Sequence, residues 1–385
     1  MKIIFNRQSI SEVLAPLMCA VSTKSTIQSI EGILIEAQAP DRCTLTSFDM
    51  EKGVQITVRT EVVEGGSYII NAQKFNQTVK VMEGDELTLT VDDKMTATFE
   101  AGKSTHKMSA LPGSDFPDRP MVSNNHGFVV SQGILKKMIN KTSHAMAVTD
   151  PRPVLNGCLF KITGNSLLTV TCDSHRLAKC EAQTTIKGAG LDGDNTNYSF
   201  IVPVKTVNEL SRMLLDSEDE DAVIFFSRKN MMMKLGDLTF FSCLIDGEYI
   251  NHDSVIIKNH TIFMEADREV LISALERAAI ITEERVPNSV RSHVKLQLEG
   301  DLLKIFAIST AGSTYDEISV DHEGDDITIA FKNRYLLDAL RACTADRVKI
   351  SLTSHLTSIN VEPCDIEADD ENKELFMLLP VRIKE

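Results

Sequence analysis

The sequence predicts an α+β fold of three similar domains, each packing two helices on antiparallel sheets. Two observations carry this prediction. Apolar residues recur every three to four positions in pairs of segments at nearly equal intervals, and between these segments the apolar period falls to two. A length of 385 residues allows three domains of ordinary size. Polar stretches at 123–126 and 258–260 give expected domains of 1–125, 126–258 and 259–385.

The first helix of each domain is expected at residues 10–21, 133–145 and 269–281. Apolar side chains recur there at spacings of three and four, which places them on one face of a helix. In the second of these helices, Lys136 and Lys137 lie mostly opposite the apolar stripe and Lys141 flanks it. We therefore expect these helices to pack on a sheet and to leave their cations exposed.

The second helix of each domain is expected at residues 73–82, 205–214 and 334–343. Apolar residues fall in register at Phe75, Val207 and Leu336, with offsets of 132 and 129 residues. The cations Lys80, Arg212 and Arg341 coincide at the same offsets, with partial support from Lys205 and Arg334. At about 100° per residue, these cations point away from the apolar stripe. Solvated charge explains one such helix, but the threefold coincidence favours a surface that contacts a polyanion.

The strands are expected where the apolar period is two. A first strand follows the first helix of each domain at 33–35, 159–162 and 294–298. A second follows at 43–46, 168–171 and 303–307, and another follows the second helix at 87–91, 223–226 and 348–352. Each domain is thus predicted to run helix, strands, helix, strands.

Composition excludes several classes of protein. The net charge of −15 argues against bulk attraction to nucleic acid, although a locally basic face remains compatible with it. Eight cysteines are scattered singly without a C-x-x-C pair, so neither a metal site nor a cofactor is expected. Apolar runs are too short to cross a membrane and the start lacks a secretory pattern, so we expect a cytoplasmic protein.

Two short motifs resemble a phosphate-binding loop and a catalytic group, but each has a simpler explanation. Gly102-Lys103-Ser104 lacks the preceding glycine and the following helix of a phosphate-binding loop, so a hairpin turn is expected. The run 172–177 contains Cys172, Asp173 and His175, but neighbouring side chains on a strand end diverge rather than form a catalytic group. A turn with backbone hydrogen bonds is the simplest interpretation, and a peptide-recognition loop is the other.

The apolar C-terminus is expected to form a last strand that packs in the third domain. Pro380 removes a backbone donor, so the strand should loosen there and offer its side chains at an edge. Methionine and leucine at such an edge are typical of an adaptable peptide-binding groove.

The chain resembles the bacterial sliding clamps, the beta subunits of DNA polymerase III, over its whole length. Leu155-Asn156-Gly157 and the run 171–177 are similar to the family motifs L-N-G and T-D-G-H-R-L. Segments at 109–117 and 244–249 resemble those that close the first two domains, and 379–382 resembles the ending M-P-M-R. The family glycine is Ser174 here and the threonine is Cys172, while Ile250 and Ser254 replace a proline and an arginine. These departures concern the peptide preference of the pocket.

The resemblance implies a DNA clamp fold that assembles into a homodimeric ring around duplex DNA without reading its sequence. The ring would be a non-catalytic processivity factor. Its implied partners are the DNA polymerase III catalytic subunit, the clamp loader, and other replication and repair proteins that carry clamp-binding peptides. Two alternatives remain: a peptide-binding adaptor of the same fold that does not encircle DNA, and an enzyme built on Asp173 and His175.

The resemblance and the helix pattern together give three sets of expected site residues. The peptide pocket would comprise Leu155, Cys172, Ser174, His175, Arg176, Leu177, Val255, Ser358, Met377, Leu378, Leu379, Pro380, Val381 and Arg382. DNA contacts would comprise Lys24, Gln73, Lys80, Lys136, Lys137, Lys141, Arg152, Lys205, Arg212, Arg334 and Arg341. The dimer interface would include His106, Met108, Ile280 and Ile281, and the terminal Ile383-Lys384-Glu385 would lie beside the pocket.

Overall fold

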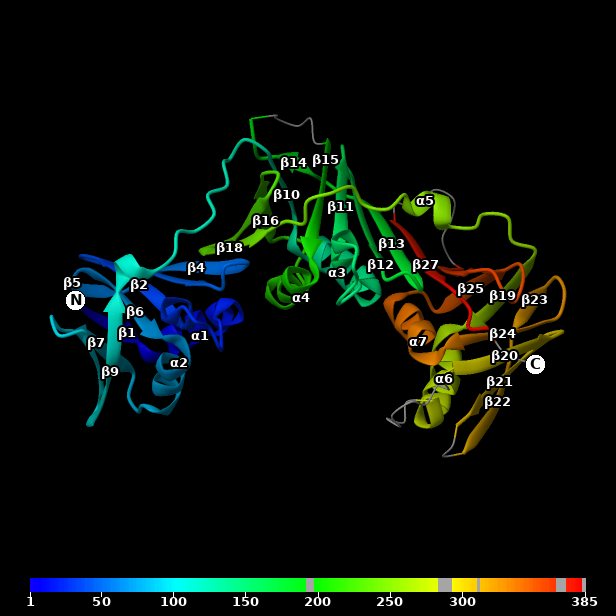
Figure 1. The fold of residues 1–385 in the computed structure, drawn as a ribbon, viewed down its shortest axis with the longest axis horizontal. Coiled ribbons are helices and arrows are strands. Elements are labelled where there is room, and N and C mark those ends of the chain that lie inside the picture. The colour runs from blue at the N-terminus through cyan, green and yellow to red at the C-terminus, as the bar shows by residue number, and fades with distance from the viewer. Residues whose placement is uncertain (192–196, 283–292, 310–311, 365–371, 383–385) are drawn as a thin grey trace. The chain divides into compact units, whose positions relative to one another are not determined.

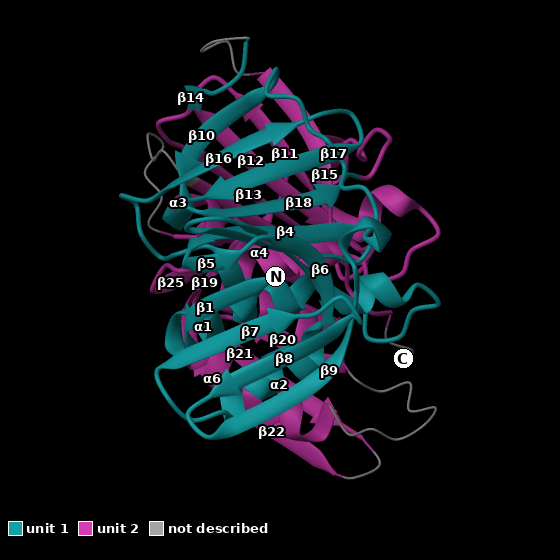
Figure 2. Ribbon diagram, turned by 90° about the vertical axis from the view of Figure 1, so that its left-hand side faces the viewer, with its two compact units in different colours: residues 1–133, 187–196, 212–244 teal, residues 134–186, 197–211, 245–385 magenta. Residues whose placement is uncertain are grey.

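The computed structural model describes all residues except 192–196, 283–292, 310–311, 365–371 and 383–385 (Figure 1). The described chain divides into two compact units (Figure 2). Unit 1 comprises residues 1–133, 187–196 and 212–244, and unit 2 comprises residues 134–186, 197–211 and 245–385. Both units contain residues from the central expected domain. None of the helices described is long and apolar enough to cross a membrane.

Unit 1 is built on one antiparallel sheet of 14 strands, in the order β14-β10-β16-β17-β18-β4-β3-β2-β6-β9-β8-β7-β1-β5. Its strands from the N-terminal third are β1 (Lys2–Asn6), β2 (Gly32–Gln38), β3 (Arg42–Phe48), β4 (Lys52–Arg59), β5 (Glu61–Glu64), β6 (Gly66–Asn71), β7 (Glu86–Val91), β8 (Thr96–Ala101) and β9 (Ser104–Pro112). The others are β10 (Gly127–Ser131), β14 (Lys187–Gly188), β16 (Asp221–Phe226), β17 (Asn230–Leu235) and β18 (Leu238–Cys243). The pairing of β18 with β4 joins the two groups of strands.

Unit 2 contains a nine-stranded sheet, β15-β11-β12-β13-β27-β26-β25-β19-β23, and a four-stranded sheet, β22-β21-β20-β24. The first is formed by β11 (Gly157–Thr163), β12 (Ser166–Cys172), β13 (Arg176–Gln183), β15 (Asn197–Pro203), β19 (Ile262–Asp267), β23 (Asp321–Glu323), β25 (Arg347–Leu352), β26 (Ile359–Pro363) and β27 (Asn372–Leu378). The second is formed by β20 (His293–Glu299), β21 (Leu302–Ile308), β22 (Ser313–Ser319) and β24 (Ile327–Lys332). The last strand, β27, lies between β13 and β26.

The described residues contain six long helices, which occur in the expected pairs. They are α1 (Arg7–Leu17) and α2 (Ala72–Val81), α3 (Gln132–Thr142) and α4 (Val204–Met213), and α6 (Arg268–Thr282) and α7 (Asn333–Ala342). Helices α1 and α2 pack together, as do α6 and α7 (Figure 1), and Ser211 Oγ on α4 donates a hydrogen bond of 2.5 Å to Asn140 on α3. A short helix, α5 (His252–Val255), lies on the connection that precedes β19.

The helix bounds confirm the sequence pattern closely, with one informative difference. Helix α1 begins at Arg7, three residues before its expected start, because the Asn6 side chain caps it by accepting from the Ser9 amide. The regular helix ends at Leu17, one residue after Pro16, and a 3₁₀ turn continues it to Ala20. Gly102-Lys103 is the β8–β9 turn, as expected, and Gly102 has φ +57°.

The three matched helices also show the expected faces. Phe75, Val207 and Leu336 are buried. Met82, Leu214 and Cys343, which follow the three helices at the same offsets, are buried too. The matched cations Lys80, Arg212 and Arg341 are exposed. Periodicity alone therefore identified which side of each helix packs in the core.

Candidate functional site

An apolar cluster in unit 2 forms what we call the pocket floor. Its buried members are Ala147, Leu155, Leu159, Leu168, Val170, Cys172, Leu177, Ile201 and Met377. Leu177 on β13 lies opposite Met377 on β27, so the last strand of the chain completes a surface begun more than two hundred residues earlier. Four expected pocket residues, Leu155, Cys172, Leu177 and Met377, are brought together here. Burial raises the pKa of the Cys172 thiol, which keeps it protonated.

Partly buried apolar residues surround the floor. They are Val154, Ile245, Tyr249, Ile250, Ile256 and Leu375. Five of them were not predicted as pocket residues from the sequence, and Ile250 was noted only as a departure from the family pattern. The spacing of Leu375 two residues before Met377, on the same strand face, was the one available signal. Burial also raises the pKa of Tyr249, so its phenol stays neutral.

Arg176 ties β13 to helix α7 beside the floor. Its Nε donates to Asp173 at 3.0 Å and its Nη1 donates to Asp338 at 2.7 Å. Its guanidinium carbon lies 4.1 Å from the centre of the Tyr335 ring. Because Arg176 is 9% exposed and has partners on three sides, it organises the site more than it offers a free cation.

The loop that contains Asp173 and His175 forms a turn. Asp173 Oδ1 accepts from the backbone amides of His175, at 3.0 Å, and Arg176, at 3.1 Å. The His175 ring instead faces Tyr335, with 6.3 Å between ring centres. An acid–base pair between Asp173 and His175 is therefore not formed, as the turn interpretation predicts.

The C-terminal segment changes character at Pro380. Leu378 is buried, whereas Leu379 is 40% exposed beyond the end of β27. The Leu379 amide donates to His175 O at 2.8 Å, and the Val381 amide donates to Ala330 O at 2.7 Å. Loosening at Pro380 is thus confirmed, and the segment is fixed by these two isolated hydrogen bonds.

The remaining expected pocket residues are divided between surface and interior. Ser174, His175 and Arg382 are exposed, Val255 on α5 is 44% exposed, and Ser358 is 4% exposed. The terminal Ile383-Lys384-Glu385 lies outside the described residues.

Most of the expected DNA-contact residues are accessible. Lys24, Gln73, Lys80, Lys137, Arg152, Lys205, Arg212, Arg334 and Arg341 are exposed, and Lys136 is half-buried. Arg341 pairs with Glu276 at 2.7 Å on the neighbouring helix α6, so its charge is partly compensated. Such a pair between exposed groups contributes little to stability.

Lys141 does not lie where the sequence pattern predicted. Its side chain is buried, with the residue 5% exposed, and Nζ forms an ion pair with the buried Glu374 and a 3.2 Å hydrogen bond with Thr344. The sequence placed Lys141 at the flank of an amphipathic stripe, but this flank faces β27. The prediction that Lys141 contacts DNA is therefore wrong for this structure.

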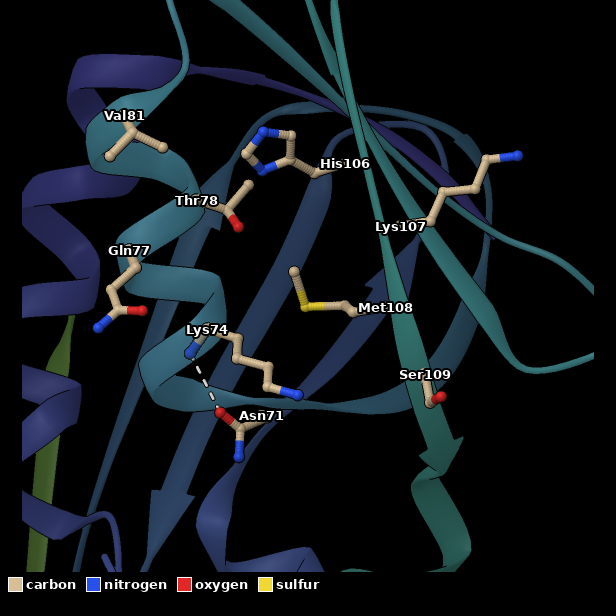
Figure 3. Close-up of a pocket in the computed structure, with 9 residues that line it drawn as sticks. All are labelled: Asn71, Lys74, Gln77, Thr78, Val81, His106, Lys107, Met108 and Ser109. Carbon is tan, nitrogen blue, oxygen red and sulfur yellow. Dashed lines mark hydrogen bonds between the residues drawn. The ribbon is translucent and has the colours of Figure 1, made fainter.

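The expected dimer contacts lie in two places. His106 and Met108 lie on β9, which faces helix α2 across a cavity of about 820 Å³ (Figure 3). The cavity is lined by Asn71, Lys74, Gln77, Thr78, Val81, His106, Lys107, Met108 and Ser109. In unit 2, Ile280 on α6 is 74% exposed and Ile281 is half-buried. Nowhere in the described ranges do three or more metal-ligating side chains cluster.

Family models of the DNA polymerase III beta subunit match almost the whole chain: its N-terminal domain at residues 1–120, its central domain at 129–251 and its C-terminal domain at 253–379. The beta sliding clamp of Haemophilus influenzae is 30% identical over 388 aligned residues, covering 100% of both chains. This chain belongs to the beta sliding clamp family.

Other clamps agree with this assignment. The beta sliding clamp of Staphylococcus epidermidis is 28% identical over 373 residues, covering 94% of each chain. The crystal structure of the DNA polymerase III subunit beta from Pseudomonas aeruginosa superposes with a TM-score of 0.88 at 27% identity, covering 100% of both chains. The clamp from Bacillus subtilis shares the fold, with a TM-score of 0.91 at 24% identity and 100% coverage of both chains. The predicted DNA clamp fold is confirmed.

Proposed function

We propose that this clamp is a homodimeric ring that encircles duplex DNA, slides on it, and tethers DNA polymerase III through its peptide pocket. As a member of the sliding clamp family it acts as a DNA polymerase processivity factor. The observation that carries the proposal is the threefold repeat of a helix that buries one face and exposes a matched cation, at Lys80, Arg212 and Arg341.

Those cations suit contact with phosphate rather than with bases. Lysine and arginine on the exposed faces of helices neutralise phosphates without reading sequence. Because the chain carries a net charge of −15, strong adhesion to DNA is not expected. The combination favours a ring that stays on DNA by topology and moves along it freely. We propose that the other exposed residues expected to contact DNA add to the same phosphate-binding surface. They are Lys24, Gln73, Lys137, Arg152, Lys205 and Arg334.

The pocket floor and its rim support binding of short peptides. The floor offers buried apolar side chains. The exposed Leu379 and His175 are joined by a backbone hydrogen bond, and the exposed Val255 is next in sequence to Ile256, which packs against the floor. Small apolar pockets of this kind bind one or two anchor side chains of a linear peptide. We propose the catalytic subunit of the polymerase, the clamp loader, and other replication and repair proteins as the sources of these peptides, and the cytoplasm as their location.

The proposed dimer uses open strand edges. Residues 104–109 of β9 pair with β8 on one side, whereas pairing with β6 involves only residues 110–112. Among the described strands, β22 is an edge of the four-stranded sheet and pairs only with β21. Two unpaired edges on different units of the chain allow head-to-tail addition between protomers. His106, Met108, Ile280 and Ile281 are the proposed contacts.

A non-catalytic role fits the position of Asp173, whose carboxylate accepts hydrogen bonds from two backbone amides and from Arg176.

The alternative function is a peptide-binding adaptor that never encircles DNA. The pocket alone would support this function. Electron microscopy of the purified protein in negative stain separates the two. The proposal predicts closed rings with a duplex-sized hole, whereas elongated monomers at all concentrations would favour the adaptor.

A further inference from the structure

The loop of residues 147–156 connects the pocket floor to an exposed arginine. Leu155 of the floor donates its amide to Arg152 O at 3.1 Å, and its own carbonyl accepts from the Ala147 amide at 3.1 Å. The Asn156 side chain holds the Asp150 backbone through hydrogen bonds of 2.7 and 3.0 Å. These hydrogen bonds tie Arg152 and Leu155 into one loop.

The side chain of Arg152 is held by two residues. Asp150 accepts from its Nε at 3.0 Å and from its Nη2 at 3.2 Å. The Ser174 hydroxyl accepts from the same Nη2 and also lies 3.5 Å from Asp150 Oδ2. A hydroxyl fits this position because it accepts from the cation and donates to the carboxylate. We call this group of three residues the latch.

Ser174 adopts a backbone conformation that favours glycine. Its φ of +74° lies in the left-handed region, which a residue with a Cβ seldom adopts. Glycine there would be unstrained but would carry no hydroxyl. Serine at this position therefore has a strained backbone but gains a hydrogen bond with Arg152.

The latch lies directly beside the pocket floor. The Ser174 amide donates to Cys172 Sγ at 3.5 Å. The charges of Arg152 and Asp150 both act on the Cys172 thiol, with opposite effects on its pKa. Ser174 therefore connects Arg152 to a residue of the pocket floor.

We propose that Ser174 is a positioning residue that holds Arg152 across the mouth of the peptide pocket, so that peptides bind more tightly when the latch opens. This inference rests on the proposed function. Arg152 is also a proposed DNA contact, and a duplex phosphate that takes the Nη2 donor now given to Ser174 would release the serine hydroxyl. Duplex DNA would thus open the latch, and by linkage a bound peptide would favour DNA contact by the same factor.

The first test removes the hydroxyl in two backbone contexts. Ser174→Ala loses the hydroxyl and keeps the strained φ, whereas Ser174→Gly loses both. The probe is a fluorescein-labelled peptide copied from the clamp-binding segment of the replicative polymerase of the same cell, followed by fluorescence anisotropy. Both variants should bind it about three- to tenfold more tightly than the parent, the scale of one hydrogen bond to a charged group at an exposed site. Ser199→Ala, an exposed serine on β15, is the matched control and should bind like the parent.

A double-mutant comparison identifies the partner. Arg152→Ala should tighten peptide binding as Ser174→Ala does, and combining the two should add nothing further. A short blunt duplex at low salt should tighten peptide binding to the parent and leave Ser174→Ala unchanged. Equal peptide affinity for the parent, Ser174→Ala and Arg152→Ala would overturn the latch. A parent protein that binds no peptide would overturn the pocket itself, and with it any latch on peptide access.

Discussion

Lys141 on helix α3 and Glu374 on strand β27 form an ion pair inside unit 2, with the two residues 5% and 7% exposed. The hydroxyl of Thr344, which follows helix α7, completes the arrangement. Three segments of the chain that are distant in sequence therefore meet at one buried charge pair.

Breaking this pair on one side should be costly. Lys141→Met leaves the Glu374 carboxylate buried without its partner, so the free energy of unfolding should fall by about 3–5 kcal/mol. The double variant Lys141→Met/Glu374→Leu should recover most of this loss, because neither charge remains buried. Urea denaturation followed by circular dichroism measures both. Equal destabilisation by the single and double variants would show that packing, not charge, dominates the site.

Reversing the matched cations should weaken binding to duplex DNA without unfolding the protein. In Lys80→Glu/Arg212→Glu/Arg341→Glu, three exposed side chains change and no buried apolar residue is touched. Affinity for a short duplex at low salt should fall, and the dependence of binding on salt should flatten by about one unit of slope for each lost phosphate contact. The control variant reverses Lys103, Lys161 and Lys234, which are exposed on strands or their turns. Equal duplex affinity in both triple variants would contradict the assignment of the helices to DNA.

The exposed edge of the pocket can be tested at Leu379 without disturbing β27. Leu379→Asp changes a side chain that is 40% exposed, so the fold should be retained. Affinity for a polymerase-derived peptide should fall at least about tenfold, because a charge replaces an apolar anchor contact. Titration calorimetry provides the measurement, and Met121→Asp, at a 95% exposed position, is the control. Unchanged affinity in Leu379→Asp would exclude this edge from the pocket.

Dimer assembly can be tested at Ile280, which is 74% exposed in the described chain. Ile280→Asp should shift sedimentation from dimer towards monomer at concentrations where the parent is dimeric, because an interface must then bury a carboxylate. Leu191→Asp, at an 83% exposed position, should sediment like the parent. Identical sedimentation of both variants would remove Ile280 from the proposed interface.

His144 should make the stability of the fold depend on pH. Burial lowers the pKa of His144 to about 4, and the nearby positive charge of Arg176 acts in the same direction. Asp338 and Asp173 oppose this effect. Its Nδ1 is buried and lacks a hydrogen-bond partner in the part of the chain that the structure describes.

Between pH 6.5 and about 4 the unfolded chain therefore binds a proton at His144 that the folded chain does not. The contribution of this residue to stability is fully present above pH 6.5 and is lost as the pH falls towards 4, to a total of about 3 kcal/mol. Urea unfolding across this range, compared with His144→Gln, should show a steeper pH dependence for the parent. Parallel curves would assign the acid sensitivity to other groups.

Periodicity identified the helices and their exposed cations because both depend on local spacing. It misplaced Lys141 because burial there is set by Glu374, which is 233 residues away. For the same reason Tyr335 and Asp338 went unnoticed as neighbours of Arg176: their helix pattern marks them as ordinary positions on a cation-bearing face. The latch was also hidden: the family's glycine at this position indicates a positive φ, but nothing in the sequence indicates that Ser174 contacts Arg152.

Topological retention on DNA tests the central claim most directly. The clamp is loaded on a nicked circular plasmid by its clamp loader, separated from free protein by gel filtration, and then the plasmid is cut once with a restriction enzyme. A ring that encircles DNA should stay with the circle and leave as soon as the DNA has ends. Clamp that remains bound to the linear plasmid at moderate salt would show that charge, rather than encirclement, holds it there.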